Sequence, residues 1–300
     1  MPAAVADDGT WLHAEETGAG TPILFVHEFA GDLRSWEPQL RWFGLRYRCV
    51  AYNARGYPPS AIPEDEAAYS QAHAVGDAIA VLDALGIERA HVVGLSMGGF
   101  CALHLALEHP ERLRSIVVAG CGYGARPDQR EGFAAEAEAT ARAFREDPVA
   151  AAHRYAAGPT RVQLRDRNPR AYAELVAQLE QHSGLGSALT MLGVQRRRPS
   201  LYELAPRLAE VTVPALLMTG DEDDGCIEPT LMLKRTMPSA GLVVLPRTGH
   251  TCNLEDPVAF NAAVQDFLTT VDGGRWSARN PESRSRGLIG MADPAAELRP

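Results

Sequence analysis

The sequence VVGLSMGGF, residues 92–100, decides how the chain is expected to fold. It matches the pattern G-x-S-x-G through Gly94, Ser96 and Gly98, and it stands between a strand-like and a helix-like segment. In that context the serine occupies a sharp strand-to-helix turn that strains its backbone and exposes its hydroxyl above a sheet. The two glycines let the strand and the helix approach without a side-chain clash. We prefer this interpretation to a glycine-rich turn with an incidental serine, because the flanking pattern fits it.

Strand-like and helix-like segments alternate around this turn. Nearly continuous apolar runs such as TPILFVH are typical of strands that are buried on both faces of a parallel sheet. The alternation predicts an α/β fold with a mostly parallel sheet and helices on both faces. Strands are expected at residues 21–27, 47–53, 89–96 and 113–120, and helices at 35–47, 70–86 and 97–110.

The alternation stops after the fourth of these strands. Residues 122–205 show a helical pattern throughout, and strands return only at 213–220 and 241–246, before a closing helix at 257–271. We therefore expect a helical cap inserted before the last two strands. The predicted division is a core of residues 1–121 and 206–272, a cap of 122–205, and a flexible tail of 273–300. Trp276 is the residue expected to anchor that tail.

Composition excludes several classes of function. The 300 residues carry a formal net charge of −9 and a single lysine, Lys234, which argues against nucleic-acid binding through a basic face. The N-terminus lacks the features of a secretory signal, and no apolar run reaches the ~20 residues that span a bilayer. The five cysteines show no CxxC spacing, and the histidines show no ligand spacing. These features predict a cytoplasmic protein with reduced thiols and without a metal site.

A serine hydroxyl needs an adjacent base that is held by a third group. The C-terminal half offers both. His250 lies in RTGHTCNLEDP between the last expected strand and the last helix, and several carboxylates follow the strand PALLM in MTGDEDDG. The order Ser…Asp…His along the chain is the one expected for such a fold.

The sequence resembles the α/β-hydrolase fold family, specifically its capped branch of serine esterases, lactonases and carbon–carbon bond hydrolases. The resemblance runs from about Thr10 to Val271, and the cap is its least specific part. The motifs that carry it are VHEFAG for the family's H-G-x loop, YNARGYPPS for its D-x-R-G-x-G-x-S stretch, GLSMGG for the elbow, TGDED for G-x-x-D, and TGH before the last helix.

The resemblance assigns roles to individual residues. It implies Ser96 as the nucleophile, His250 as the general base and Asp223, three residues after Gly220, as the group that orients the base. Carboxylates that rank lower for this third role are Asp221, Asp224 and Asp128. A serine at the elbow points to attack on a carbonyl, because family members that dehalogenate alkyl halides or open epoxides use a carboxylate there.

The oxyanion hole is expected from two backbone amides, those of Met97 and Phe29. Between His27 and Phe29 the family places a glycine where this chain has Glu28. We expect Glu28 to turn away from the pocket and pair with a cation, with Arg55 as the candidate. The alternative is a carboxylate that faces the pocket and holds a water or a cationic or hydroxylated substrate. We favour the first, because a carboxylate aimed at a forming oxyanion would oppose catalysis.

Some further residues are weaker candidates. Met191 and Leu192 in the cap are candidates for lining a substrate pocket, although such spacing usually reflects helix packing. The run Arg196–Arg198 is interpreted as a solvated charged surface rather than as an anion site. His27 is expected to be a structural hydrogen-bonding residue, and Cys252 a buried, inert thiol.

Together these features predict a cofactor-free serine hydrolase that acts on a small-molecule carboxylic ester or lactone through an acyl-enzyme. A carbon–carbon bond hydrolase of a dione, which uses the same triad, stays open, as does acyl transfer. A non-catalytic ligand-binding member of the fold is the alternative from another class. The expected partner is the small-molecule substrate, with neither nucleic acid nor a membrane, and a homodimer is left open.

Overall fold

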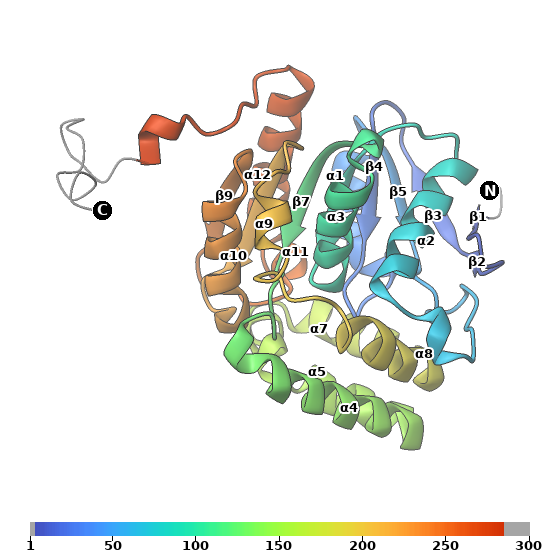
Figure 1. Ribbon diagram of the computed structural model, residues 1–300. Helices are drawn as coiled ribbons and strands as arrows, with labels where there is room; N and C mark the ends of the chain where they lie inside the picture. Colours follow the sequence, from blue (N-terminus) through green and yellow to red (C-terminus); the bar gives the residue numbers. More distant parts are fainter. Residues whose placement is uncertain (1–3, 285–300) are drawn as a thin grey trace.

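The computed structural model describes residues 4–284, and within them a twisted sheet lies between layers of helices (Figure 1). The main sheet of this part of the chain has the strand order β3-β5-β4-β6-β7-β8-β9. All its neighbouring strands run parallel except β3 and β5, which are antiparallel. The strands of the described residues are β1 (Ala4–Val5), β2 (Trp11–Leu12), β3 (Ala14–Thr17), β4 (Pro22–Val26), β5 (Arg48–Tyr52), β6 (Ala90–Leu95), β7 (Leu113–Ala119), β8 (Ala215–Gly220) and β9 (Ala240–Leu245).

Four helices of the sheet layers lie where they were expected: α1 (Glu37–Phe43), α2 (Gln71–Ala84), α3 (Met97–Glu108) and α12 (Pro257–Asp272). The others were not predicted, and they are η1 (Leu33–Trp36), η2 (Glu66–Ala68), η3 (Pro110–Arg112), α10 (Asp224–Thr236) and α11 (Cys252–Glu255). Two of the predicted helices end at the residues that the sequence indicated. Helix α2 ends before Gly86, which adopts a positive φ of 64°, and α3 ends before Pro110.

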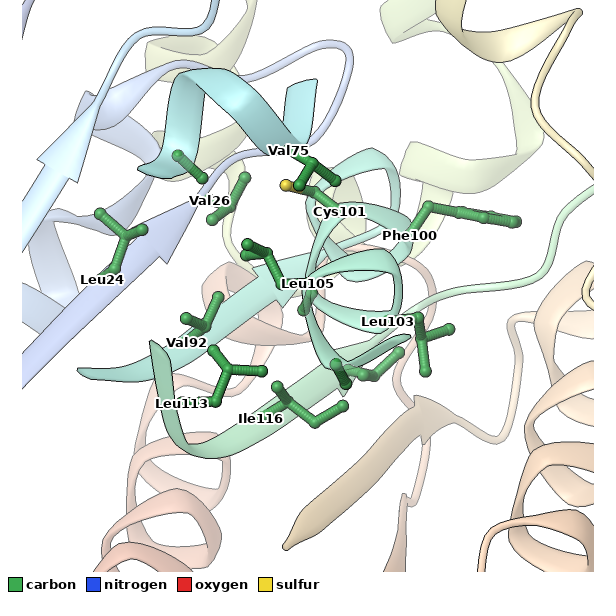
Figure 2. Packing of buried hydrophobic residues seen from close by; sticks show 14 of the residues in the cluster. Leu24, Val26, Val75, Val92, Phe100, Cys101, Leu103, Leu105, Leu113 and Ile116 are labelled. Carbon is green, nitrogen blue, oxygen red and sulfur yellow. The ribbon is translucent and has the colours of Figure 1, made fainter. Parts of the chain in front are cut away.

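The sheet is buried on both faces, as the apolar runs predicted. In β4, Leu24 and Val26 pack into one core with α2 and α3, part of which Figure 2 shows. Ile23 and Phe25 alternate with them and pack on the opposite face, against η1, α1 and α12. Because successive side chains of a strand point to opposite faces, a strand between two helical layers must be apolar at every position. The predicted α/β fold class is confirmed.

Three N-terminal strands were not predicted. Strand β3 has the sequence AEET, and its three last side chains are exposed, so it has no apolar alternation that would identify it. It adds to the edge of the sheet through antiparallel pairing with β5. The two-residue strands β1 and β2 form a small separate ribbon. Strands as short as β1 and β2, or as polar as β3, are defined by backbone pairing, which local sequence does not show.

A helical segment lies between β7 and β8, as expected. Figure 1 shows most of its helices as a layer of their own beyond the sheet, whereas the last one, α9, lies beside α10. Two polar contacts help to tie it to the loop after β4: a buried ion pair between Glu28 and Arg161, and a contact of 3.2 Å between Asp32 and His182. Its elements are η4 (Pro127–Gln129), α4 (Arg130–Glu146), α5 (Pro148–Ala156), η5 (Pro159–Arg161), α6 (Val162–Arg167), α7 (Pro169–Leu179), α8 (Gly184–Leu189), the π-helix η6 (Thr190–Gln195) and α9 (Ala205–Leu208).

The chain after α12 is held against the core by Trp276 and by a hydrogen bond of 2.9 Å from the Arg279 amide to the Pro238 carbonyl. The Trp276 indole N–H donates to the Ser239 carbonyl at 2.8 Å, and its ring packs edge-on against Phe267 with centroids 4.6 Å apart. Trp276 therefore anchors this segment, as predicted. A single turn, η7 (Pro281–Arg284), follows, and the rest of the predicted flexible tail lies outside the described residues. Among residues 4–284, no helix combines the length and apolarity needed to cross a membrane.

Candidate active site

Ser96 occupies the turn between β6 and α3 in a strained conformation, with φ 53° and ψ −110°. A Cβ atom on Gly94 would lie 2.1 Å from the Gly98 carbonyl oxygen, and one on Gly98 would lie 2.0 Å from the Val26 carbonyl oxygen. The turn therefore needs glycine at both positions. Ser96 is partly exposed, whereas its neighbours on both sides are buried. The close approach through the glycines thus presents one hydroxyl at the carboxyl end of the sheet.

His250 and Asp223 meet at the same end of the sheet. The imidazole Nδ1 of His250 lies 2.9 Å from Asp223 Oδ2, and both side chains are buried. The alternative carboxylates lie elsewhere. Asp221 accepts the Thr248 amide at 3.2 Å, and Asp128 is exposed and paired with Arg126. Of the carboxylates that the sequence offered for this position, Asp223 is the one hydrogen-bonded to His250.

The charges of this pair shift both pKa values in the direction of an imidazolium–carboxylate pair. Burial by itself lowers the pKa of His250, but the Asp223 charge and hydrogen bond outweigh it and raise that pKa above its ordinary value. For Asp223, burial raises the pKa, and the His250 charge and hydrogen bond bring it below the ordinary value. The carboxylate therefore stays ionised and can stabilise a protonated imidazole.

The turn that carries His250 is fixed by Glu255, which sequence reasoning did not single out. Its buried carboxylate accepts the Gly249 amide at 2.5 Å, the Thr251 amide at 2.9 Å and the Thr251 hydroxyl at 2.8 Å. These bonds hold the backbone on both sides of the imidazole. The only sequence signal was an acidic residue five positions after the histidine, which by itself indicates nothing specific.

A cavity of about 400 Å³ connects these groups with the inserted segment. Ser96 and His250 both line it, so the structure brings the predicted nucleophile and base to one space. The remaining wall comes mainly from α4, α5 and η6, through side chains such as Phe144 and Met191. Met191 lines the cavity, whereas Leu192 packs into the cluster around Phe29 and is not part of the wall among the described residues.

Two backbone amides lie near the nucleophile without an acceptor. Met97 is the first residue of α3, where an amide has no acceptor within its own helix. Within residues 4–284 no acceptor is bonded to the Phe29 amide either. The absence of a side chain at Gly98 lets the start of α3 approach Val26 and His27, and so brings the loop of Phe29 beside the elbow.

The predicted partner of Glu28 is wrong. Arg55 bonds to Asp77 and Asp8, whereas Glu28 pairs with Arg161 of the inserted segment at 2.5 Å. Glu28 and Arg161 are 1% and 0% exposed, and Glu28 is not among the residues that line the cavity. The expectation that the carboxylate pairs with a cation and turns away from the pocket was right, although the cation is Arg161. Its partner could not be read from the sequence, because the two residues are separated by 133 positions.

The interpretation of Arg196–Arg198 as a solvated surface is wrong for its last member. Arg196 and Arg197 lie on the outside and pair with Glu138 and Glu66. Arg198 is only 4% exposed and lines the cavity with Ser96.

The remaining candidates have structural roles. His27 accepts the Ala54 amide through Nε2 at 3.0 Å, and its Nδ1–H donates to the Glu28 carbonyl at 2.7 Å, so the ring fixes the loop after β4. Burial lowers its pKa to about 4. Asn53 accepts from the Leu33 amide and donates to the Pro58 carbonyl. It thus joins the segment after β4 to the loop after β5. Cys252 is buried, and burial raises the pKa of its thiol.

One cluster of the described residues has the spacing of metal ligands: Asp223, Cys226 and His250. Their ligand atoms lie within 4.8 Å of one another. A metal would require the Cys226 thiolate, but burial and the neighbouring Asp223 charge raise the pKa of that thiol well above its ordinary value. The Nδ1 atom of His250 is already hydrogen-bonded to Asp223. The chemistry of this donor set therefore fits a protonated hydrogen-bond network better than a metal site.

Comparisons with known proteins identify the family to which this fold belongs. Residues 21–257 match the family model described as alpha/beta hydrolase fold. The chain is 29% identical to 2-hydroxy-6-oxo-6-phenylhexa-2,4-dienoate hydrolase of Burkholderia cepacia, over 86% of this chain and 91% of that protein. It superposes on the enol-lactonase of Burkholderia xenovorans LB400 with a TM-score of 0.76 and 26% identity, covering 89% and 100% of the two chains. It superposes on a thermophilic esterase of Thermogutta terrifontis with a TM-score of 0.79 and 25% identity, covering 90% of this chain and 98% of that one.

Proposed function

The chain belongs to the α/β hydrolase fold family and is a hydrolase, and on this premise we propose that it cleaves a small-molecule carboxylic ester or lactone through a Ser96–His250–Asp223 triad. The observation that carries the proposal is the arrangement around the cavity. A strained, partly exposed serine shares the cavity with a histidine whose other ring nitrogen is bonded to a buried carboxylate. No cofactor is required for such chemistry.

The proposed reaction begins with addition of the Ser96 oxygen to the substrate carbonyl, while Nε2 of His250 takes the hydroxyl proton. Collapse of the tetrahedral intermediate breaks the bond to the leaving alcohol, which receives that proton from His250. A water molecule, deprotonated by His250, then attacks the acyl-enzyme, and collapse of the second tetrahedral intermediate breaks the bond to Ser96, which takes the proton back from His250 as the carboxylic acid leaves. Asp223 keeps the proton on Nδ1 and stabilises the imidazolium at each transfer, as its lowered pKa allows.

The oxyanion would be held by the amides of Met97 and Phe29, which have no acceptor in the described part of the chain. The Phe29 side chain packs against Phe144 and Tyr155 of the inserted segment, with ring centroids 5.8 and 5.3 Å apart. We propose that residues 122–205 act as a cap that both shapes the cavity and holds the oxyanion loop. The ion pair between Glu28 and Arg161 would likewise hold the oxyanion loop against this cap.

Hydrolysis of a carbon–carbon bond in a dione is the second candidate. The relative from Burkholderia cepacia is named as a hydrolase of a dienoate, and it is similar over most of both chains. The same serine, base and oxyanion hole would serve that reaction. A panel of esters, lactones and diones distinguishes the two candidates, since each predicts turnover of a different member of the panel.

Reaction with a fluorophosphonate probe tests the triad directly. The purified protein should be labelled at Ser96, and Ser96→Ala should abolish labelling while leaving the thermal unfolding transition in place. Absence of labelling in the folded wild-type protein would instead support a non-catalytic ligand-binding protein. Labelling that persists in Ser96→Ala would place the nucleophile elsewhere.

We also propose the cellular compartment and the binding partner of the protein. The five cysteines are free and buried, which fits a reducing compartment such as the cytoplasm. The proposed partner is the small-molecule substrate, and the net charge of −9 supports the exclusion of nucleic acid. Size-exclusion chromatography with light scattering would determine whether the chain forms the homodimer left open above.

A further inference from the structure

Arg198 differs from the other buried arginines of residues 4–284. Arg55 is paired with two carboxylates and Arg161 with one, but no carboxylate of the described chain lies within ion-pair distance of Arg198. Buried charges in proteins are usually paired, because an isolated charge loses its hydration without compensation. Arg198 is also the one of these three that lines the cavity.

The contacts of Arg198 leave part of its guanidinium unused. Its two Nη groups donate to the Gln195 side-chain oxygen and to the Tyr123 carbonyl, the latter at 2.8 Å. Its Nε–H is buried and has no partner among the described residues. A guanidinium has five N–H donors, so donors remain for a further acceptor. The acceptors already present are neutral and leave the charge uncompensated.

The position of Arg198 relative to the nucleophile follows from Phe100. The Phe100 amide donates to the Ser96 carbonyl at 3.0 Å, so its ring projects from α3 one turn, or about 5.4 Å, beyond the serine. Figure 2 shows Phe100 on this helix. The Arg198 guanidinium carbon lies 3.8 Å from the centre of that ring. The cation therefore lies beside the first turn of the helix that carries Ser96.

The surrounding charges preserve the positive character of this part of the cavity. Burial lowers the pKa of Arg198 to about 10, so the group stays protonated at neutral pH. The neighbouring Cys121 thiol has a pKa raised by burial to about 12 and stays neutral. Arg130 donates to the Arg198 carbonyl at 2.8 Å and adds a second cation nearby. The acidic and basic cavity residues Glu136 and Arg154 are exposed, where solvent screens charge.

We propose that Arg198 binds a carboxylate of the substrate, so that the preferred substrates are esters or lactones that carry a second, ionised carboxyl group near the scissile carbonyl. This inference rests on the proposed function. The planar fork of a guanidinium matches a carboxylate, and a ligand carboxylate would supply the charge that the chain itself does not provide. The cation–π contact with Phe100 holds the fork in place before the substrate arrives.

The test compares two substrates that differ only in charge: mono-4-nitrophenyl adipate and its methyl ester. The adipate chain is long enough to limit attack by its own carboxylate, and a reaction without protein corrects for the remainder. The measured quantity is the ratio of kcat/KM for the acid to kcat/KM for the methyl ester. Because general damage to the fold lowers both values together, it leaves this ratio unchanged.

Arg198→Gln should lower the ratio by about 10- to 100-fold, as expected for loss of a hydrogen bond to a charged group. Arg198→Lys should recover part of it. Arg197→Gln is the matched control: it is adjacent, exposed and paired with Glu66, and should leave the ratio within about twofold. A ratio that is unchanged in Arg198→Gln overturns the proposal and assigns Arg198 a purely structural role.

Calorimetric titration with adipate separates this inference from the proposed function. Should the protein turn over neither ester, adipate must still bind to the wild-type protein and to Arg197→Gln, and at least about tenfold more weakly to Arg198→Gln. Failure of the fluorophosphonate probe together with Arg198-dependent adipate binding would refute catalysis and retain the anion site. Adipate binding that is absent, or independent of Arg198, refutes the anion site whether or not Ser96 reacts.

Discussion

Breaking the buried pair of Glu28 and Arg161 should destabilise the fold much more than removing both charges together. The two side chains are 1% and 0% exposed, so neither can regain hydration when its partner is lost. Loss of one partner from a buried ion pair costs about 3–5 kcal/mol, whereas replacement of both by apolar residues is often close to neutral. Glu28→Met and Arg161→Met should therefore each lose about 3–5 kcal/mol, and the double variant much less.

Urea unfolding followed by circular dichroism measures these differences. The free energies of unfolding of the wild type, the two single variants and the double variant form a double-mutant cycle. We expect a coupling energy of about 3 kcal/mol or more between the two positions. The reasoning is refuted if either single variant loses less than about 1 kcal/mol, or if the two losses simply add in the double variant.

The same variants should shift the pH dependence of catalysis in opposite directions. The Arg161 charge lowers the pKa of His250, and the Glu28 charge raises it. His250 acts as a base only when it is unprotonated, so kcat/KM rises as the pH rises through its pKa. Glu28→Met leaves the Arg161 charge unopposed, lowers the His250 pKa and should move the acid limb to lower pH. Arg161→Met should move it to higher pH, and shifts in the same direction would indicate a general loosening instead.

Two further predictions concern the triad and the elbow. Asp223→Asn keeps the shape of the side chain but removes the charge that supports protonated His250. This substitution should lower kcat by about 10⁴-fold with little change in thermal stability. A loss of less than about tenfold would exclude Asp223 as the orienting group. Gly98→Ala would place a methyl group 2.0 Å from the Val26 carbonyl oxygen and should cost about 3 kcal/mol or more in urea unfolding, whereas Gly76→Ala, a helical position with open space, should be neutral or stabilising. Equal stability of these two glycine variants would contradict the close approach of α3 to β4.

The elbow and the order of the core elements could be predicted because local sequence determines them. Gly94 is required by a contact within one strand–turn–helix unit and Gly98 by the approach of the same unit to β4, so the constraint appears as a short motif. His250 and Asp223 each follow a strand of the same parallel sheet, and the carboxyl ends of such strands meet at one edge. Their hydrogen bond is thus a consequence of topology that the sequence already indicates.

The contacts of the inserted segment could not be predicted, because they depend on how its helices dock. The partner of Glu28 lies in a one-turn element, η5, whose sequence PTR carries no pattern that points to the loop after β4. Arg196, Arg197 and Arg198 are identical in chemistry and adjacent in the turn after η6, yet Arg198 is the one of the three that lines the cavity. Composition alone cannot distinguish such neighbours.

The histidine turn closes on itself between Gly249 and Glu255, since both oxygens of one carboxylate are occupied by donors from this short loop. On the proposed function, proton transfer is consequently assigned to this self-contained histidine turn, and substrate selection to the inserted segment that docks against the loop after β4. The inserted segment could then change in evolution, and so alter which substrates enter the cavity, without disturbing the histidine turn.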